Sequence, residues 1–227
     1  MKNDDDRPAI AIFDLDRTIT KYDTYSRYLL GFLKRQPFRL FSTYSLPWVA
    51  IQFKLGLVDN TYVKLHFLQK ILAGNNRKVI DTWTAIFIEN LLNKGLYKKA
   101  VERINHHRTR GDRLVLATAS FDFYVIPLAA CLGFDDVVCT RSVWDNFDHL
   151  SPSLSGMNCY GEAKLFYLKE HLGSLLSDTH IIAYSDHHSD LPLLKWSHQA
   201  VAVNPTRQLS NIASNYGFTV EDWSREE

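Results

Sequence analysis

Short apolar runs recur along the chain and end in polar residues. They cover residues 9–13, 114–117, 137–139, 180–184 and 200–203. Runs of this length without alternating polar positions are typical of strands buried on both faces of a sheet. Segments with helical spacing lie between them, at residues 123–132, 162–172 and 191–195. Strand and helix in alternation predict an α/β fold with a parallel sheet and right-handed crossovers.

Residues 24–105 interrupt this alternation. They show helical patterns at 24–35, 38–56, 60–73 and 77–94, and another helix is expected at 96–108. We therefore predict a core made of residues 1–20 and 96–227, with residues 21–95 inserted as an all-helical cap. Residues 142–158 are rich in Ser, Asp, Asn and Pro and predict a long loop or a hairpin.

The composition becomes informative when the charge is counted separately for two parts of the chain. The 227 residues are 46% hydrophobic and carry a net charge of +1, which excludes a uniformly basic nucleic-acid binder. Residues 21–110 hold sixteen Lys/Arg against five Asp/Glu, a charge of +11, whereas the remainder holds ten against twenty, a charge of −10. This asymmetry indicates two parts with different roles. The three cysteines do not suggest a disulfide framework, and no signal peptide is expected.

Polar residues with matching chemistry follow the predicted strands or begin a helix. They are Asp14, Asp16, Thr118, Lys164, Asp186 and Asp190. In parallel sheets, ligands bind beyond the carboxyl ends of the strands. A carboxylate nucleophile, a carboxylate for proton transfer, a hydroxyl and an ammonium for phosphate oxygens, and further carboxylates for Mg²⁺ would together form a phosphoryl-transfer site.

Each feature alone also has a purely structural explanation. Asp186 and Asp190 could cap the short helix that follows them, and Thr118 could simply end a strand. A single lysine such as Lys164 is usually solvated. The histidines show no zinc-binding spacing, so they carry less weight. The phosphatase prediction rests on the combination and the order of the residues.

In that order the motifs resemble those of the haloacid dehalogenase (HAD) superfamily of phosphatases. The Asp14-Leu15-Asp16-Arg17-Thr18 segment, a Thr/Ser motif, a Lys and a paired-Asp motif follow one another as in that superfamily, most closely in its phosphoserine-phosphatase-like branch. The resemblance implies a Rossmann-like core, Mg²⁺ dependence and an aspartyl-phosphate intermediate.

The resemblance also implies roles for single residues. Asp14 matches the nucleophile and a metal ligand. Asp16 matches the general acid/base, whose backbone carbonyl also meets the metal. Thr118 matches the phosphate-binding hydroxyl, and Lys164 matches the cation that orients the phosphate.

The last motif supplies the remaining roles and two departures. Asp186 matches a metal ligand, and Asp190 matches a supporting carboxylate. Arg17 stands where many members carry a small residue, and Ser185 stands where glycine is common. Both departures concern the fine geometry of the site rather than its chemistry.

Residues of the cap bear on the identity of the substrate. Phosphoserine phosphatases carry a Glu early in the cap that helps hold the substrate amine, and the matching residue here is the shorter Asp23. The basic, aromatic cap, with Lys34 and Arg35 before Gln36-Pro37, resembles that of members acting on phosphatidylglycerophosphate. We therefore expect a small or a lipid phosphomonoester.

Two alternatives to a hydrolase stay open, a phosphotransferase of the same fold and a non-catalytic module that binds an anionic membrane or a protein. The expected partner is an anionic, phosphate-bearing substrate, and no nucleic acid is expected. The basic cap is also suited to peripheral contact with an anionic membrane. The expected location is the cytoplasm, with the inner face of a membrane as a peripheral site.

Overall fold

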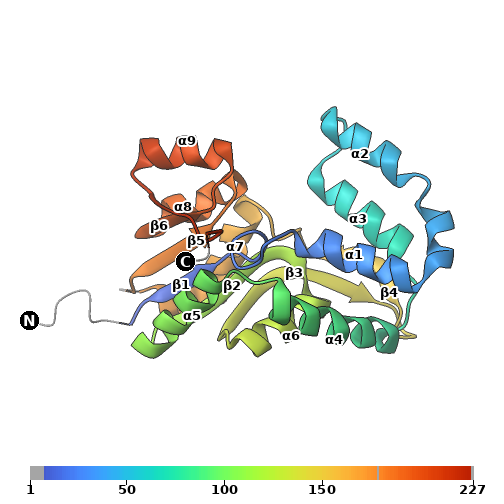
Figure 1. The fold of residues 1–227 in the computed structure, drawn as a ribbon, viewed down its shortest axis with the longest axis horizontal. Helices are drawn as coiled ribbons and strands as arrows, with labels where there is room; N and C mark the ends of the chain where they lie inside the picture. The colour runs from blue at the N-terminus through green and yellow to red at the C-terminus, as the bar shows by residue number, and fades with distance from the viewer. Residues whose placement is uncertain (1–7, 178, 226–227) are drawn as a thin grey trace, which may run out of the picture.

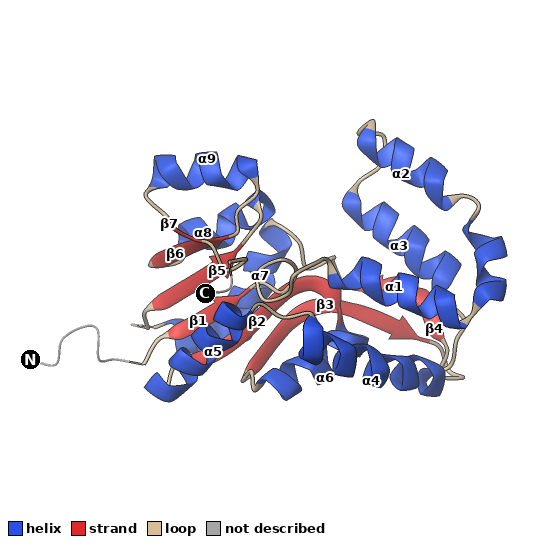
Figure 2. Cartoon of the chain, in the orientation of Figure 1, coloured by secondary structure: helices blue, strands red, loops and turns tan. Residues whose placement is uncertain are grey.

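The fold is built on one seven-stranded sheet, seen in the computed structural model of Figures 1 and 2, which describes residues 8–177 and 179–225. The strand order is β4-β3-β2-β1-β5-β6-β7, and neighbouring strands are parallel except for the antiparallel pair β3 and β4. The bounds are β1 (Ile10–Phe13), β2 (Arg113–Phe121), β3 (Asp136–Trp144), β4 (Leu150–Ser155), β5 (Ile181–Ser185), β6 (Gln199–Val203) and β7 (Thr219–Glu221). The expected α/β class and Rossmann-like parallel sheet are confirmed.

Helices cover both faces of the sheet. One face carries α5 (Lys98–Arg110) and α6 (Asp122–Leu132), and the other carries α7 (Glu162–Leu172), α8 (Leu191–Trp196) and α9 (Arg207–Tyr216). Short 3-10 turns, η3 (Gly173–Leu176) and η4 (His188–Asp190), follow α7 and precede α8. This layering places the carboxyl ends of β1, β2 and β5 at a single edge, where ligands bind in such folds.

Strand β1 shows why its sequence lacks polar alternation. Ala11 and Phe13 pack in the apolar cluster that includes α5 and α6, whereas Ile10 and Ile12 pack in the cluster formed with α7, α8 and α9. All four side chains are buried. Each large side chain removed from water contributes about 1.5–3 kcal/mol to stability, so both faces of the strand favour apolar residues.

The cap lies between β1 and β2 in sequence and projects to one side of the sheet in Figure 1. It comprises α1 (Thr24–Arg35), the 3-10 helix η2 (Pro37–Thr43), α2 (Leu46–Lys54), α3 (Asn60–Ile71) and α4 (Arg77–Lys94). Its apolar residues, among them Tyr28, Leu68 and Leu91, belong to the same cluster as Phe13. The cap is therefore packed continuously onto one face of the core.

Two chain segments run side by side where the cap meets the core. Thr20 and Leu96 form an antiparallel bridge, and the Lys21 amide donates to the Gly95 carbonyl over 2.8 Å. The division into a core of residues 1–20 and 96–227 and a cap of residues 21–95 stays a prediction. Residues 1–7, 178 and 226–227 of the predicted core lie outside the described residues.

Two elements differ from the sequence expectation. Residues 38–56, expected as one helix, divide into η2 and α2, because Pro47 is suited only to the first turn of a helix and α2 therefore begins next to it. The 142–158 segment contains strand β4, which pairs with β3 as a hairpin. Helix α9 and strand β7 were not expected. Thr219 and Val220 of β7 are exposed and carry no buried-strand pattern.

Candidate active site

Three adjacent strands bring the predicted residues together. Asp14 directly follows β1, and Asp186 directly follows β5, which pairs with β1. Thr118 lies in β2, on the other side of β1, at a point where the pairing with β3 shifts register. Irregularities of this kind turn a strand locally and are common beside active sites.

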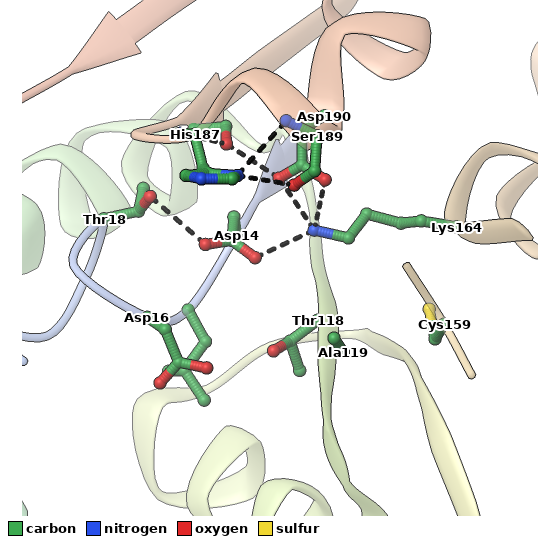
Figure 3. Close-up of polar contacts among 12 residues, drawn as sticks. Asp14, Asp16, Thr18, Thr118, Ala119, Cys159, Lys164, His187, Ser189 and Asp190 are labelled. Atoms are coloured by element: carbon green, nitrogen blue, oxygen red, sulfur yellow. Dashed lines mark hydrogen bonds and ion pairs between the residues drawn. The ribbon is translucent and has the colours of Figure 1, made fainter. Parts of the chain in front are cut away.

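Lys164 joins two of the carboxylates (Figure 3). Its Nζ lies 2.8 Å from Asp14 Oδ1 and 2.8 Å from Asp190 Oδ2, and Ser185 Oγ donates to the same Asp190 oxygen over 2.7 Å. Lys164, Asp14 and Asp190 are 2%, 7% and 2% exposed. Burial alone would lower the pKa of Lys164, but the charges of Asp14 and Asp190 raise it above its usual range, so the ammonium stays charged.

A glycine sets the direction from which Lys164 enters the site. Gly161 has φ 60° and ψ −128°, a conformation that other residues rarely adopt, and α7 begins directly after it. Lys164 therefore falls in the first turn of α7, and its side chain reaches the ends of β1 and β5. The structure thus places Lys164 beside Asp14, as the order of the motifs predicts, while the role of Lys164 in binding phosphate stays a prediction.

The loop after β1 is held by a threonine. Thr18 Oγ1 lies 3.3 Å from Asp14 Oδ2, to which it donates, and it accepts the backbone amide of Asp186 over 3.0 Å. Arg17, one residue earlier, has φ 61°. A non-glycine residue in this left-handed conformation costs about 1–2 kcal/mol. Arg17, which stands where a small residue is common, therefore carries this cost in backbone conformation.

The site holds more carboxyl groups than its single lysine can neutralise, and burial makes each of them harder to ionise. Burial raises the pKa of Asp14 to about 7, although Lys164 lowers it. Burial and the charges of Asp14, Asp190 and Asp16 raise the pKa of Asp186 to about 8. Each carboxylate is therefore costly to ionise at neutral pH unless a cation stands beside it.

Asp16 is turned away from Asp14 (Figure 3), and it is hydrogen-bonded to Thr24 at the start of the cap. The backbone amide and the hydroxyl of Thr24 both donate to Asp16 Oδ1 over 2.6 Å, and Ser120 Oγ donates to Oδ2 over 2.9 Å. Burial, followed by the charge of Asp23, raises the pKa of Asp16 to about 6, against the lowering effect of the Thr24 hydrogen bonds. A carboxyl group with a pKa near neutrality can both give and take a proton.

The donor set fits a small hard cation. Asp14 and Asp186 offer carboxylate oxygens, and the backbone carbonyl of Asp16 is the third ligand that the motif implies. Within residues 8–177 and 179–225, no group of three or more His, Cys, Asp or Glu side chains forms a complete cage. Two carboxylates and a carbonyl match Mg²⁺, which usually retains several waters and binds substrate phosphate oxygens rather than an all-protein cage.

Sequence reasoning missed the partners of Asp16 and one cationic side chain. Thr24 and Ser120 are ordinary hydroxyl residues in the sequence, and only the fold places them on Asp16. Lys64, in α3, is buried beside Ala119, and nothing in the local sequence distinguishes it from other cap lysines. Asp23 is the expected match to a substrate-binding residue; its side chain accepts the Ser26 amide as the N-cap of α1 while it also lines the cavity.

A cavity of about 510 Å³ lies between the cap and the core. Its polar side contains Asp14, Asp16, Thr118, Lys164 and Asp186, and its cap side contains Tyr25, Leu29, Phe53, Val63 and Phe67. All four motifs thus face one space. The polar side suits a phosphate group, and the cap side, which also contains Asp23, Asn60 and Lys64, offers both apolar and polar contacts to the rest of a substrate.

Known proteins are similar to this chain in sequence and in fold. The model of the haloacid dehalogenase-like hydrolase family matches residues 11–195. A Mycobacterium tuberculosis protein named as a probable phosphatase is 26% identical over 219 residues, which cover 95% of this chain and 75% of that protein. A Bordetella pertussis Tohama I protein of unknown function has a similar structure, with a TM-score of 0.84, 23% identity and coverage of 95% and 99%. A phospho-aspartyl intermediate analogue of phosphoserine phosphatase has a TM-score of 0.61, 15% identity and 90% coverage of both chains.

Proposed function

The chain belongs to the haloacid dehalogenase-like hydrolase family and is an enzyme of its phosphatase type, and from that premise we propose that it hydrolyses phosphomonoesters through an aspartyl-phosphate on Asp14. The observation that carries the proposal is the position of Asp14. Its carboxylate ends a buried strand, accepts hydrogen bonds from Lys164 and Thr18, and faces a cavity that Asp16 also lines. The similar fold of phosphoserine phosphatase, solved as a phospho-aspartyl intermediate analogue, supports the same intermediate.

The proposed reaction has two steps. A carboxylate oxygen of Asp14 attacks phosphorus, the bond to the leaving oxygen breaks, and protonated Asp16 gives that oxygen its proton. Asp16, now ionised, then takes a proton from a water molecule that attacks the phosphorus, and phosphate leaves with Asp14 restored. The pKa of about 6 at Asp16 suits this exchange near neutral pH.

The remaining residues bind and orient the phosphate group. Lys164 is already charged and directed at Asp14, so it can neutralise a phosphate oxygen without rearranging. The Thr118 hydroxyl, which accepts the Ser120 amide over 3.1 Å, still has a proton to donate to a second phosphate oxygen. Mg²⁺ bound by Asp14, Asp186 and the Asp16 carbonyl would offset the charge of the transferring group.

The first test is a panel of phosphorylated amino acids, sugars, nucleotides and lipids, each assayed with Mg²⁺ and with EDTA. We expect phosphate release that requires Mg²⁺. We also expect Mg²⁺ at a hundred times its Kd to stabilise the folded protein by about 2.7 kcal/mol, which raises Tm by several degrees. The rise should be smaller in Asp186→Asn and unchanged in Asp81→Asn, a control at an exposed carboxylate on α4.

Three outcomes of the panel would contradict parts of the proposal. Undiminished turnover in EDTA would contradict the proposed requirement for Mg²⁺. Transfer of the phosphoryl group to an added alcohol in place of water would make the enzyme a phosphotransferase. Absence of turnover on every phosphomonoester would leave the non-catalytic alternative.

An exposed aromatic stripe on the cap bears on the substrate class. Phe38, Phe41, Tyr44 and Trp48 are 85%, 83%, 81% and 63% exposed, and they recur every three or four residues along η2 and α2. Residues 24–58 contain five Lys/Arg and no Asp/Glu. Within the described part of the chain, no helix is both long enough and apolar enough to cross a bilayer.

We propose that this stripe contacts an anionic lipid surface, and that the surface is the cytoplasmic, inner face of a membrane. Aromatic side chains insert at the headgroup level, and each nearby Lys or Arg contributes about 1 kcal/mol of attraction. Phe53, which is 46% exposed and also lines the cavity, connects the stripe with the active site. A lipid phosphomonoester could then enter from the membrane, whereas a small one would enter from solvent.

Vesicle co-sedimentation tests the membrane contact. We expect binding to vesicles of phosphatidylcholine with phosphatidylglycerol, weaker binding to phosphatidylcholine alone, and loss of binding as salt rises. Phe41→Ser combined with Trp48→Ser should reduce the binding by about tenfold or more. Phe147→Ser, at an 82% exposed aromatic in the β3–β4 turn, is the matched control. Failure to bind anionic vesicles at low salt, or phosphoserine hydrolysis far above that of every lipid phosphate, would contradict the lipid proposal.

A further inference from the structure

Lys64 reaches from the cap into the core beside the active site. It lies in α3, and its side chain is only 7% exposed. Its Nζ donates to Asn158 Oδ1 over 2.8 Å, to Thr140 Oγ1 over 3.0 Å, and to the backbone carbonyl of Ala119. The three protons of the ammonium thus have three acceptors, all of which belong to the core.

The buried surroundings of the Lys64 side chain disfavour its charged form. Its three hydrogen-bond partners are a carbonyl, a hydroxyl and an amide oxygen, none of them charged, and Asp16 and Asp23 act on it only through space. The Phe121 ring centroid lies 4.4 Å from Nζ. Burial lowers the pKa of Lys64 to about 7. A methionine would fill this space without the desolvation cost, so packing alone does not account for a lysine here.

The acceptors connect Lys64 to the reacting groups. Ala119 lies between Thr118, the phosphate-binding hydroxyl, and Ser120, whose Oγ donates to Asp16. Thr140 Oγ1 donates to the same Ala119 carbonyl over 2.6 Å and lies 3.0 Å from Lys64 Nζ, so the ammonium and the hydroxyl together hold that peptide. A displacement of the Ala119 carbonyl would therefore move both Thr118 and Ser120.

The same helix makes a second bond to the core. Asn158 Nδ2 donates to Thr61 Oγ1 over 3.2 Å, while Asn158 Oδ1 accepts from Lys64, three residues further along α3. Asn158 therefore bonds to two successive positions on one face of the helix. These bonds require Thr61 and Lys64 of α3 to lie beside Ala119, Thr140 and Asn158, so they would break if α3 were to leave the core.

We propose that Lys64 is a latch that holds the cap on the core and, through the Ala119 carbonyl, positions Thr118 and Ser120 for catalysis. This inference rests on the proposed phosphatase function. Lys64 is a positioning residue, since it acts on the phosphate through Thr118 and on Asp16 through Ser120. When the cap lifts, the latch opens and the 118–120 segment loses a hydrogen bond, so turnover is favoured only with the cap closed.

The test compares Lys64→Met with Lys70→Met, the same change on the same helix outside the cavity. With p-nitrophenyl phosphate and Mg²⁺, we expect Lys64→Met to lower kcat by about tenfold or more, with KM within about twofold of wild type and a cooperative melting transition retained. Asn158→Ala should lower kcat similarly, and the double variant should be no slower than either single one. Lys70→Met should match wild type.

Hydrogen exchange provides a readout that needs no turnover. Faster exchange in residues 60–71 and 118–121 of Lys64→Met, but not of Lys70→Met, is the expected result. If wild type hydrolyses no phosphomonoester, the proposed function fails while the exchange comparison still decides whether Lys64 latches the cap. Wild-type kcat and exchange in Lys64→Met would overturn the latch, and so would a lowered Tm with kcat unchanged. A loss confined to substrates with a second anionic group, with p-nitrophenyl phosphate unaffected, would also overturn it, because Lys64 would then bind substrate directly.

Discussion

Asparagine in place of Asp14 is expected to reduce phosphate release from p-nitrophenyl phosphate by a factor on the order of 10³ or more. The amide has no carboxylate oxygen with which to attack phosphorus, so the first step is lost. Its carbonyl oxygen can still accept the hydrogen bond that Lys164 donates over 2.8 Å, and the side chain keeps its volume. We therefore expect the circular dichroism spectrum and a cooperative melting transition to be retained.

A labelling measurement separates this role from a general loss of binding. Acid quenching after a brief exposure to ³²P-labelled substrate should leave label on the wild-type protein and none on Asp14→Asn. Asp81→Asn, an exposed carboxylate on α4, should be labelled and active like wild type. If Asp14→Asn retains a substantial part of the wild-type turnover or label, the nucleophile is another residue.

Lys164→Met should be the most destabilising single change in the site. Its ammonium is the common partner of Asp14 and Asp190, at 2.8 Å from each, and removal leaves two buried carboxylates without their cation. Breaking a buried ion pair on one side costs about 3–5 kcal/mol. Urea denaturation should show this loss in the free energy of unfolding, together with a fall in kcat by a factor on the order of 10² or more.

Lys169→Met provides the matched control, because Lys169 is exposed on the same helix. Its Nζ lies 5.4 Å from the Trp196 ring centroid, so its free energy of unfolding should change by no more than about 1 kcal/mol, with kcat unchanged. A third variant, Lys164→Met with Asp190→Asn, removes one of the unpaired charges and should recover part of the lost stability but none of the activity. Wild-type stability in Lys164→Met would show that the two carboxylates are neutralised in another way.

Much of the sheet could be predicted from the sequence because its strands are buried on both faces. Apolar runs such as Ile10–Phe13 are typical of strands that helices cover on both sides, and the polar residue after each run marks the ligand-binding edge. The positions of Asp14 and Asp186 at that edge therefore follow from the sequence pattern. The edge strand β7, with the exposed Thr219 and Val220, has no such pattern and was missed.

The residues around Asp16 could not be predicted in the same way. Ser120 lies 104 positions from Asp16 in sequence, and Lys64 lies 55 positions from Ala119. Such pairs depend on how the cap helices pack on the sheet, and a single sequence carries no record of that packing. Thr24 is closer in sequence, but its double hydrogen bond to Asp16 requires the turn that starts α1 at Asp23.

Which groups can do chemistry, and at which strand ends they lie, could be predicted from consecutive residues, because burial and turn formation produce local sequence patterns. How those groups are used depends on the packing of distant segments. This packing turned Asp16 toward Thr24 and Ser120, set Lys164 between two buried carboxylates, and inserted Lys64 from the cap into the core. The pKa values and the hydrogen-bond partners of these side chains depend on burial and on contacts between distant parts of the chain. Both arise only when the chain has folded.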